Sequence, residues 1–280
     1  MRFVFCGFDF FDECLRRFLE AGHELHAAFC QPVDGYYNSN LSVRSICKAK
    51  GVSLQERKIT VQDIEAFKKA GCHFLVSAAH VYKIPANELR SAGIRGINIH
   101  PTLLPEGRGP WPLPRIIFKD LKKSGVTIHE LSEEFDSGDI LAQKSFNVMP
   151  DENLETLSCK SQMIAADLVS ELTSDSSWIK RAGSKQGKGS YWAMPNEAER
   201  CIDWNKPVIE IDRVIRAFGK FESWAKFDGK DWLVQDGTVW KEKHNYIPGQ
   251  VVQRTNKEVV ISAKDGFVCV RQFKLELTDK

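Results

Sequence analysis

Apolar runs and amphipathic segments alternate along the first half of the chain. Compact apolar runs, typical of buried strands, are found at residues 2–6, 24–30, 73–77, 95–99 and 126–131. Segments with apolar positions at helical spacing are found at residues 11–21, 42–50, 61–70, 111–122 and 154–172. Strands that alternate with helices favour a parallel sheet with right-handed crossovers. We therefore expect an α/β fold with a Rossmann-like, mostly parallel sheet and flanking helices.

The pattern changes in the last third of the chain. Residues 173–189 are rich in serine, lysine and glycine, a composition typical of a linker. A helical period follows at residues 209–218, and after it come short strand-like runs divided by glycine, which predict a small β-rich, OB-like C-terminal domain. We expect a large first domain over residues 1–180, a linker over 181–200 and the small domain over 201–280.

Composition narrows the function classes. The 280 residues carry a formal net charge of only +2, so nucleic acid is not expected as a partner, because phosphate binding usually appears as a strong basic excess. The eight cysteines have no paired spacing and are expected to be reduced thiols. The first apolar run is too short for a signal peptide, and no apolar stretch could span a membrane, so we expect a cytoplasmic protein.

Asn98 and His100 lie two residues apart at the end of an apolar run, so their side chains point to the same side of an extended strand. In parallel sheets, ligands bind beyond the carboxyl ends of the strands, where this pair falls. Asp136 follows the next predicted strand, in an Asp-Ser-Gly-Asp loop that also offers Asp139. An amide that polarises a carbonyl, an imidazole that moves protons and a carboxylate that holds the imidazole suit acyl transfer.

Each of these residues also has a structural interpretation. A loop asparagine often satisfies backbone groups, an isolated histidine is more often structural, and Asp-Ser-Gly-Asp is an ordinary turn sequence. The spacing of Asn98 and His100, followed by Pro-Thr-Leu-Leu-Pro, favours catalysis.

No GxGxxG motif supports nicotinamide binding. His129 and the pair Cys72-His73 lack the companions of a metal site, and we expect them to be packing or surface residues.

Residues 96–105 and 136–140 together resemble the formyltransferase family, which moves a formyl group from 10-formyltetrahydrofolate to an amine. The resemblance is strong over residues 2–172 and weaker in the tail. It implies that Asn98, His100 and Asp136 are the catalytic residues, that the formyl donor is 10-formyltetrahydrofolate and that no metal is needed. It also implies that two loops hold the folate, largely through backbone atoms. The residues matched to these loops are Tyr82, Lys83, Ile84, Ser132, Glu133, Glu134 and Phe135.

The acceptor is inferred from the same resemblance. Gln186, residues 202–204 and residues 213–218 look like landmarks that methionyl-tRNA formyltransferase shares with amino-sugar formyltransferases. The tRNA enzyme carries a basic inserted loop where this chain has residues 31–40, and this stretch contains no lysine or arginine. An RNA-binding loop without cations would lack the main source of affinity. The expected acceptor is therefore the amine of a nucleotide-linked amino sugar, such as a UDP- or dTDP-amino-dideoxyhexose.

Tyr36, Tyr37 and Arg108 are the residues expected to bind this acceptor. The main alternative is a methionyl-tRNA formyltransferase. Two further alternatives are a formyltetrahydrofolate hydrolase, in which water replaces the amine, and a folate-binding protein without activity. The expected partners are therefore folate and a nucleotide sugar, with no membrane. Because members of the family are often dimeric, a homodimer is one expected assembly.

Overall fold

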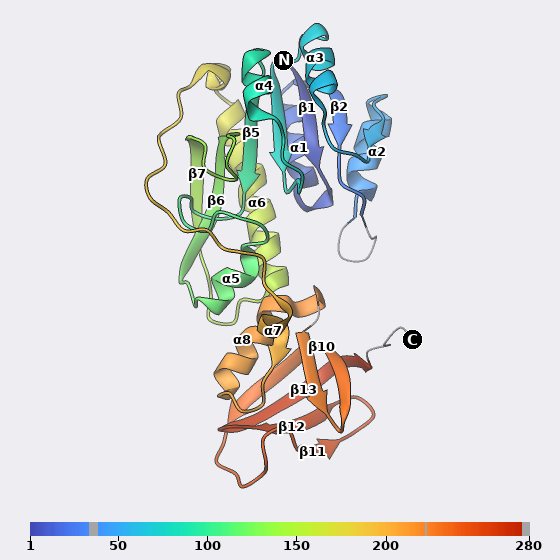
Figure 1. Cartoon of the computed structure of the whole chain (residues 1–280), viewed down its shortest axis with the longest axis vertical. Helices are drawn as coiled ribbons and strands as arrows, with labels where there is room; N and C mark the ends of the chain where they lie inside the picture. The colour runs from blue at the N-terminus through green and yellow to red at the C-terminus, as the bar shows by residue number, and fades with distance from the viewer. Residues whose placement is uncertain (34–38, 222, 276–280) are drawn as a thin grey trace. The chain divides into compact units, whose positions relative to one another are not determined.

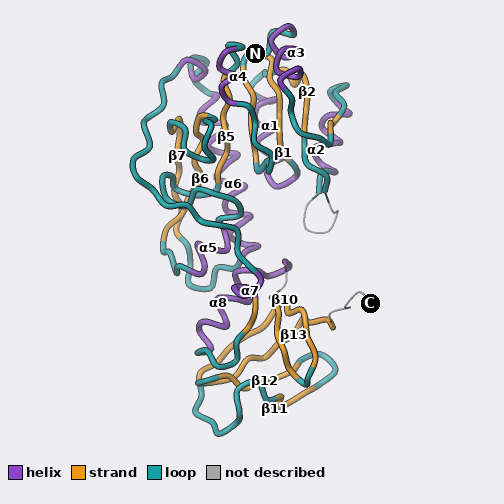
Figure 2. The backbone as a smooth tube through the Cα atoms, in the orientation of Figure 1, coloured by secondary structure: helices purple, strands orange, loops and turns teal. Residues whose placement is uncertain are grey.

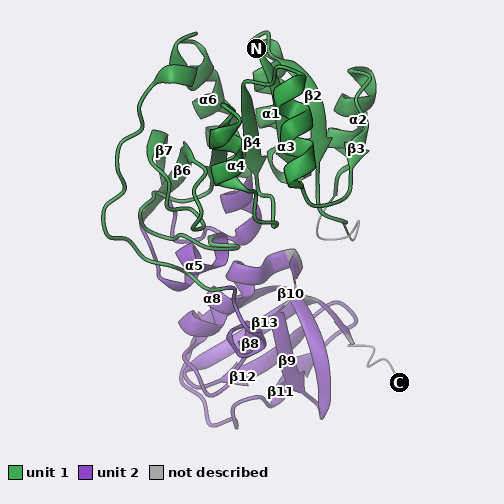
Figure 3. Ribbon diagram, turned by 45° about the horizontal axis from the view of Figure 1, so that its top comes forward, with its two compact units in different colours: residues 1–112, 123–147, 159–193 green, residues 113–122, 148–158, 194–280 purple. Residues whose placement is uncertain are grey.

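The computed structural model describes residues 1–33, 39–221 and 223–275. The chain forms two compact units, which Figure 3 colours separately. Unit 1 comprises residues 1–112, 123–147 and 159–193, and unit 2 comprises residues 113–122, 148–158 and 194–280. Unit 2 thus includes two segments from within the expected first domain. The proposed boundaries at 180 and 200 stay a prediction.

A seven-stranded mixed sheet forms the centre of unit 1, with the strand order β3-β2-β1-β4-β5-β6-β7 (Figure 1). Its strands are β1 (Arg2–Gly7), β2 (Glu24–Phe29), β3 (Leu54–Gln55), β4 (Phe74–Ala78), β5 (Arg95–His100), β6 (Lys123–Glu130) and β7 (Ile140–Asn147). Strands β1 to β5 pair in parallel, whereas β6 runs antiparallel to β5 and β7. The expected mostly parallel sheet is confirmed, with an antiparallel edge.

Two buried clusters cover the two faces of this sheet, because successive residues of a strand point to opposite sides. In β1, Phe3 and Phe5 belong to one cluster and Val4 and Cys6 to the other. The first cluster includes residues of α1, α2 and α6, and the second includes residues of α3 and α4. These helices are α1 (Asp12–Glu20), α2 (Leu41–Ala49), α3 (Val61–Lys69), α4 (Ala86–Ser91) and α6 (Leu154–Thr173), and short 3-10 helices lie at Asp9–Phe11 (η1) and Trp178–Lys180 (η2). The flanking helices are thus confirmed.

Three elements of unit 1 were not expected from the sequence. Strand β3 has two residues and α4 has six, so neither is long enough to show a period. Strand β7 lies at the edge of the sheet and alternates half-buried with exposed positions, which gives it a polar composition. The predicted helix 111–122 is shorter in the structure, as α5 (Leu113–Phe118), and belongs to unit 2.

Residues 181–193 were expected to begin a linker, but they lie along unit 1 as an ordered loop (Figure 2). Ser184 forms a bridge with Ile140 at the start of β7, and its backbone N–H and carbonyl are both hydrogen-bonded to Ile140 at 2.8 Å. Further along, Tyr191 forms a parallel bridge with Arg108. This loop is therefore part of the structure that surrounds the end of β5.

Unit 2 is built on a six-stranded sheet with the order β11-β12-β13-β10-β9-β8. Its elements after α5 are α7 (Glu197–Arg200), β8 (Cys201–Ile202), α8 (Val208–Phe218), η3 (Gly219–Phe221), β9 (Ser223–Phe227), β10 (Lys230–Lys241), β11 (Val251–Arg254), β12 (Val259–Ala263) and β13 (Gly266–Leu275). Ile211 and Ile215 of α8 share a buried cluster with Val259 and Ile261 of β12. The expected small β-rich domain is confirmed.

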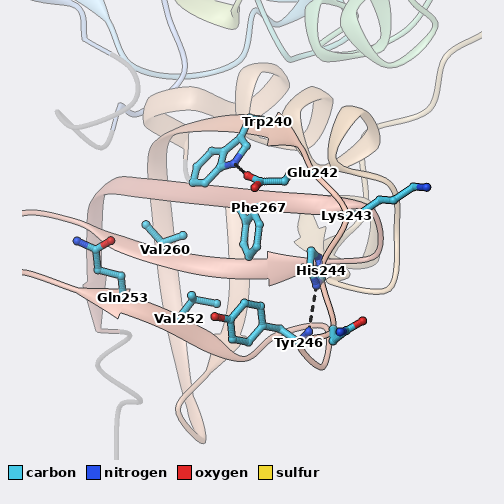
Figure 4. A pocket seen from close by; sticks show the side chains of 10 residues that line it. Trp240, Glu242, Lys243, His244, Tyr246, Val252, Gln253, Val260 and Phe267 are labelled. Atoms are coloured by element: carbon cyan, nitrogen blue, oxygen red, sulfur yellow. Dashed lines mark hydrogen bonds between the residues drawn. The ribbon is translucent and has the colours of Figure 1, made fainter.

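A groove of about 600 Å³ lies on unit 2 (Figure 4). Its aromatic side chains form a contiguous row, in which the rings of Trp240 and Phe267 are 5.3 Å apart and those of Phe267 and Tyr246 are 5.9 Å apart. The indole N–H of Trp240 donates a hydrogen bond to Glu242. Of the predicted site residues that the structure describes, none lines this groove.

Candidate active site

Asn98 and His100 lie at the carboxyl end of β5, where the sequence predicted them to share one side of the strand. Ile97, which precedes Asn98, and Ile99, which lies between Asn98 and His100, are buried in the core cluster on the opposite face. The alternation of the strand therefore fixes Ile97 and Ile99 in the core and directs Asn98 and His100 to the other side. His100 is 5% exposed, and Asn98 is half-buried.

Asp136 is held in place by the loop that follows β6. Its φ angle is +55°, in the left-handed region that aspartate adopts more readily than most residues. Two residues later, a Cβ on Gly138 would lie 1.9 Å from the carbonyl oxygen of Glu130, so only glycine fits there. The side chain of Gln186 donates to the carbonyl oxygens of Asp136 and Gly138, at 2.9 and 2.6 Å. The carboxylate therefore projects from a well-fixed loop.

The structure brings the three predicted residues together. Oδ1 of Asp136 lies 3.1 Å from Nδ2 of Asn98 and 3.5 Å from Nδ1 of His100. The second carboxylate oxygen accepts a hydrogen bond of 2.9 Å from the backbone N–H of Gly109. The other ring nitrogen of His100, Nε2, lies 2.8 Å from the carbonyl oxygen of Gly107, to which it donates. The Nδ1 lone pair of a neutral His100 therefore faces the carboxylate.

Burial and the neighbouring charges shift the pKa values of Asp136 and His100 in opposite directions. Burial raises the pKa of Asp136, but His100, His129 and the N–H of Gly109 outweigh burial, and the pKa falls from 3.8 to about 2. For His100, burial lowers the pKa below 6.5, although Asp136 and the Gly107 carbonyl oppose it. The net shift of the His100 pKa is therefore downward, because His100 is almost fully buried.

A fourth polar side chain, His129 of β6, belongs to the same cluster. Its Nε2 lies 3.1 Å from Nδ2 of Asn98 and 3.6 Å from Oδ1 of Asp136, and the residue is only 1% exposed. The antiparallel register of β5 and β6 places His129 directly opposite Asn98. Sequence reasoning assigned His129 to packing or the surface. The signal that could have found it is the register of an antiparallel neighbour of the Asn98 strand.

A cavity of about 450 Å³ lies in unit 1 and is lined by residues on both sides of Asp136 in the chain. Its lining includes four residues of the predicted folate loops, namely Lys83, Glu133, Glu134 and Phe135, and also Arg108. The remaining lining residues are Ser137, Gly189, Ser190 and Tyr191. The last three come from the loop that the sequence assigned to a linker, so sequence reasoning missed them.

The other three predicted folate residues do not line the cavity. Ile84 is 5% exposed and belongs to the core cluster that includes α3 and α4. The hydroxyl of Ser132 donates to the carbonyl oxygen of Glu134 at 2.8 Å and lies 2.9 Å from the hydroxyl of Ser137, which fixes the loop itself. The ring of Tyr82 packs edge-on against His80. Their side chains have structural contacts, and a role for their backbone atoms stays a prediction.

Of the three residues predicted to bind the acceptor, the structure describes only Arg108. Nε and Nη2 of Arg108 donate to Oε1 of Gln186 at 3.1 and 2.8 Å, so its guanidinium is anchored to the loop of residues 181–193. Tyr36 and Tyr37 lie outside the described residues.

Among the residues that the structure describes, no group of three or more His, Cys, Asp or Glu side chains is placed to hold a metal ion. Within the same ranges, every helix is too short or too polar to cross a bilayer.

Two solved structures share the fold of this chain. HypX from Aquifex aeolicus in complex with tetrahydrofolic acid has a TM-score of 0.74 at 20% identity, and the match covers 99% of this chain and 44% of HypX, so the chain spans less than half of that protein. An N-formyltransferase from Helicobacter canadensis, in complex with folinic acid and dTDP-3-aminofucose, has a TM-score of 0.71 at 18% identity, with 97% and 99% of the two chains covered.

Sequence comparisons identify the family. A methionyl-tRNA formyltransferase from Coxiella burnetii is 25% identical, over 98% of this chain and 91% of its own length. The family model described as formyl transferase matches residues 21–172, and the model described as formyl transferase, C-terminal domain, matches residues 196–279. Together the two models account for most of the chain. The chain therefore belongs to the formyl transferase family and is a formyl-transfer enzyme.

Proposed function

We propose that this protein transfers the formyl group of 10-formyltetrahydrofolate to the amine of a nucleotide-linked amino sugar. The observation that carries the proposal is the meeting of Asn98, His100 and Asp136 at the end of β5, in a loop structure that also lines a ligand-sized cavity. The acceptor class rests on further arguments, because the same three groups could serve any amine.

The donor fits the cavity in size and lining. A volume of about 450 Å³ lies within the range of small-molecule sites, which is roughly 300–1,000 Å³. The exposed ring of Phe135 offers an apolar face, and Arg108 supplies positive charge at the same cavity, whereas Lys83 is paired with Glu133 at 3.2 Å. A reduced folate combines a flat pterin with an anionic tail, and the Phe135 ring and the Arg108 guanidinium are the groups that complement them. HypX and the Helicobacter canadensis enzyme bind folates in their solved structures, which supports the same donor class.

The geometry of His100 suits proton transfer. In the neutral state its Nε2–H donates to Gly107, so the lone pair is on Nδ1, on the side of the Asp136 carboxylate, and can take a proton from the attacking amine there. The imidazolium formed in this way is stabilised by the ionised Asp136, 3.5 Å away. The amine forms a bond to the formyl carbon, the bond from that carbon to the folate nitrogen breaks, and His100 returns the proton to the folate nitrogen.

A nucleotide sugar is favoured over tRNA as the acceptor for two reasons. Residues 31–40 contain no lysine or arginine, and the chain as a whole has a net charge of +2, so a strongly salt-dependent RNA affinity has no evident source in the sequence. The Helicobacter canadensis neighbour has dTDP-3-aminofucose in its structure. The second candidate is methionyl-tRNA formylation, and the sequence similarity to the Coxiella burnetii enzyme specifically favours it.

The test is a comparison of acceptors with the purified full-length protein. UDP- and dTDP-linked amino sugars and methionyl initiator tRNA are each incubated with 10-formyltetrahydrofolate at about 150 mM salt. Release of tetrahydrofolate and the mass of the product are measured, with Asp136→Asn as the inactive control. Formylation of at least one amino-sugar nucleotide, well above the control, supports the proposal. Efficient formylation of tRNA alone would establish the second candidate instead.

A further inference from the structure

The amide nitrogen of Asn98 is surrounded by two hydrogen-bond acceptors. Nδ2 lies 3.1 Å from the carboxylate oxygen Oδ1 of Asp136 and 3.1 Å from Nε2 of His129, and these two atoms are 3.6 Å from each other. Asp136 is ionised because its pKa is about 2, so its oxygen can only accept. The role of the second neighbour depends on which nitrogen of His129 carries the proton.

The other side of the His129 ring settles that choice. Its Nδ1 lies 2.8 Å from the carbonyl oxygen of Glu130, and a carbonyl oxygen can only accept a hydrogen bond. Nδ1 therefore carries the proton and donates. In the neutral ring this leaves a lone pair on Nε2, which accepts a hydrogen bond from Asn98. Because His129 is 1% exposed, no solvent is available to replace either partner.

This arrangement determines the orientation of the Asn98 amide. Nδ2 is within hydrogen-bond distance of both acceptors, Oδ1 of Asp136 and Nε2 of His129. A rotation of the amide by half a turn would bring its carbonyl oxygen against two acceptors, an unfavourable contact on both sides. The carbonyl oxygen Oδ1 has no hydrogen-bond partner among the described residues, and it is not one of the buried unpartnered atoms. It is therefore the end of the amide that a ligand can reach.

We infer that His129 is a positioning residue for the reaction: by accepting a hydrogen bond from Asn98, it holds the amide with its carbonyl oxygen presented to the acceptor amine. This inference rests on the proposed function for the identity of the reacting amine. It differs from the sequence-based expectation that Asn98 polarises the formyl carbonyl by donating a hydrogen bond.

The chemical consequence concerns the attacking amine. A neutral amine has two N–H bonds besides the lone pair that attacks the formyl carbon. Oδ1 of Asn98 accepts one N–H bond, which aims the lone pair and stabilises the positive charge that grows on nitrogen during attack. The remaining proton passes to Nδ1 of His100. His129 contributes through Asn98 alone, so its effect should disappear when the amide of Asn98 is absent.

A double-mutant cycle tests this dependence. His129→Leu, which cannot accept the hydrogen bond, should lower kcat about tenfold, because one buried hydrogen bond of typical strength is lost. The same change in an Asn98→Ala background should alter kcat by less than about twofold. His129→Gln keeps an acceptor oxygen and should recover most of the loss. His73→Leu, at an exposed histidine of the same unit, serves as the matched control and should leave kcat unchanged.

An equal loss of kcat from His129→Leu in both backgrounds would overturn the inference, since it would show a general structural role. A second measurement requires no turnover. Side-chain nitrogen NMR of the ¹⁵N-histidine-labelled free protein at neutral pH should show His129 with its proton on Nδ1. A proton on Nε2 would reverse the orientation of Asn98 and overturn the inference. Because this measurement uses no acceptor, it distinguishes an error in the inference from an error in the proposed acceptor class.

Discussion

Asp136→Asn replaces a carboxylate with an amide of nearly the same shape and removes the negative charge between His100 and His129. In the native protein, the two carboxylate oxygens accept hydrogen bonds from Asn98 and from the backbone N–H of Gly109. An amide has an acceptor at only one end, so one of these two donors must face its NH₂ group. The variant therefore tests the charge and the hydrogen bonds of the site with little change in volume.

The effect on stability follows from the pKa. The pKa of Asp136 is about 2 instead of 3.8, and each pKa unit corresponds to about 1.4 kcal/mol, so the ionised carboxylate contributes about 2 kcal/mol to the free energy of unfolding. Because the folded pKa is the lower one, this contribution is present above about pH 4 and is lost as the pH falls towards 2. In the acid range above about pH 4, where the charge of His100 holds this pKa down, Asp136→Asn should lower the Tm of unit 1 by about 4–8 °C and flatten its dependence on pH.

The effect on activity should be larger. Without the Asp136 charge, the pKa of His100 falls further, and its imidazolium form is less stable in the transition state. We expect kcat to fall at least about a hundredfold, with the acidic limb of kcat/KM shifted to lower pH. Release of tetrahydrofolate measured from pH 5 to 9 gives both values. A native Tm combined with an unmoved acidic limb would refute the reasoning and would indicate that another carboxylate, such as Asp139, has this role.

Three further predictions concern the same site. Asn98→Ala, His100→Ala and Asp136→Ala should each lower kcat at least about a hundredfold, and their combined loss should be far from additive; near-normal steady-state turnover of the His100 variant would contradict the mechanism. Gly138→Ala should reduce both Tm and activity, because its Cβ would overlap a carbonyl oxygen at 1.9 Å, while Gly187→Ala, which has open space around it, should behave as wild type in thermal unfolding; equal effects of the two changes would show that the loop adapts. Finally, tRNA binding measured by filter retention at 50–200 mM salt should be weak with a shallow log–log slope, and a steep slope would favour the tRNA acceptor.

The fold of unit 1 could largely be predicted from its sequence because its strands and helices have strong, regular periods. The two faces of β1 illustrate this, since Phe3 and Phe5 alternate with Val4 and Cys6 and each pair belongs to a different buried cluster. The elements that escaped prediction are those in which periodicity is weak. Strand β7 has exposed polar residues along an edge, and β3 consists of only two residues.

Some residues of the candidate site could likewise be predicted from the sequence, and others could not. Asn98 and His100 could be found from the sequence because positions two residues apart in one strand must share a side, and this is a local property. His129 could not be found so easily, because its relation to Asn98 depends on the antiparallel pairing of β5 with β6, which the sequence did not reveal. The contribution of the loop of residues 181–193 was also missed, since an irregular loop without a period resembles a linker in composition.

The contacts of Gln186 have a consequence for protein engineering. This one side chain accepts a hydrogen bond from Arg108 and donates to the backbone of the Asp136 loop, so it connects three segments that are far apart in the sequence. A chimera that joins this catalytic unit to the C-terminal domain of a relative could be cut at residue 181 on grounds of composition alone. Such a junction would replace Gln186 and the loop around it by the relative's residues, so the support of the carboxylate loop would depend on how that foreign loop packs. The junction should instead follow residue 193, where unit 1 ends.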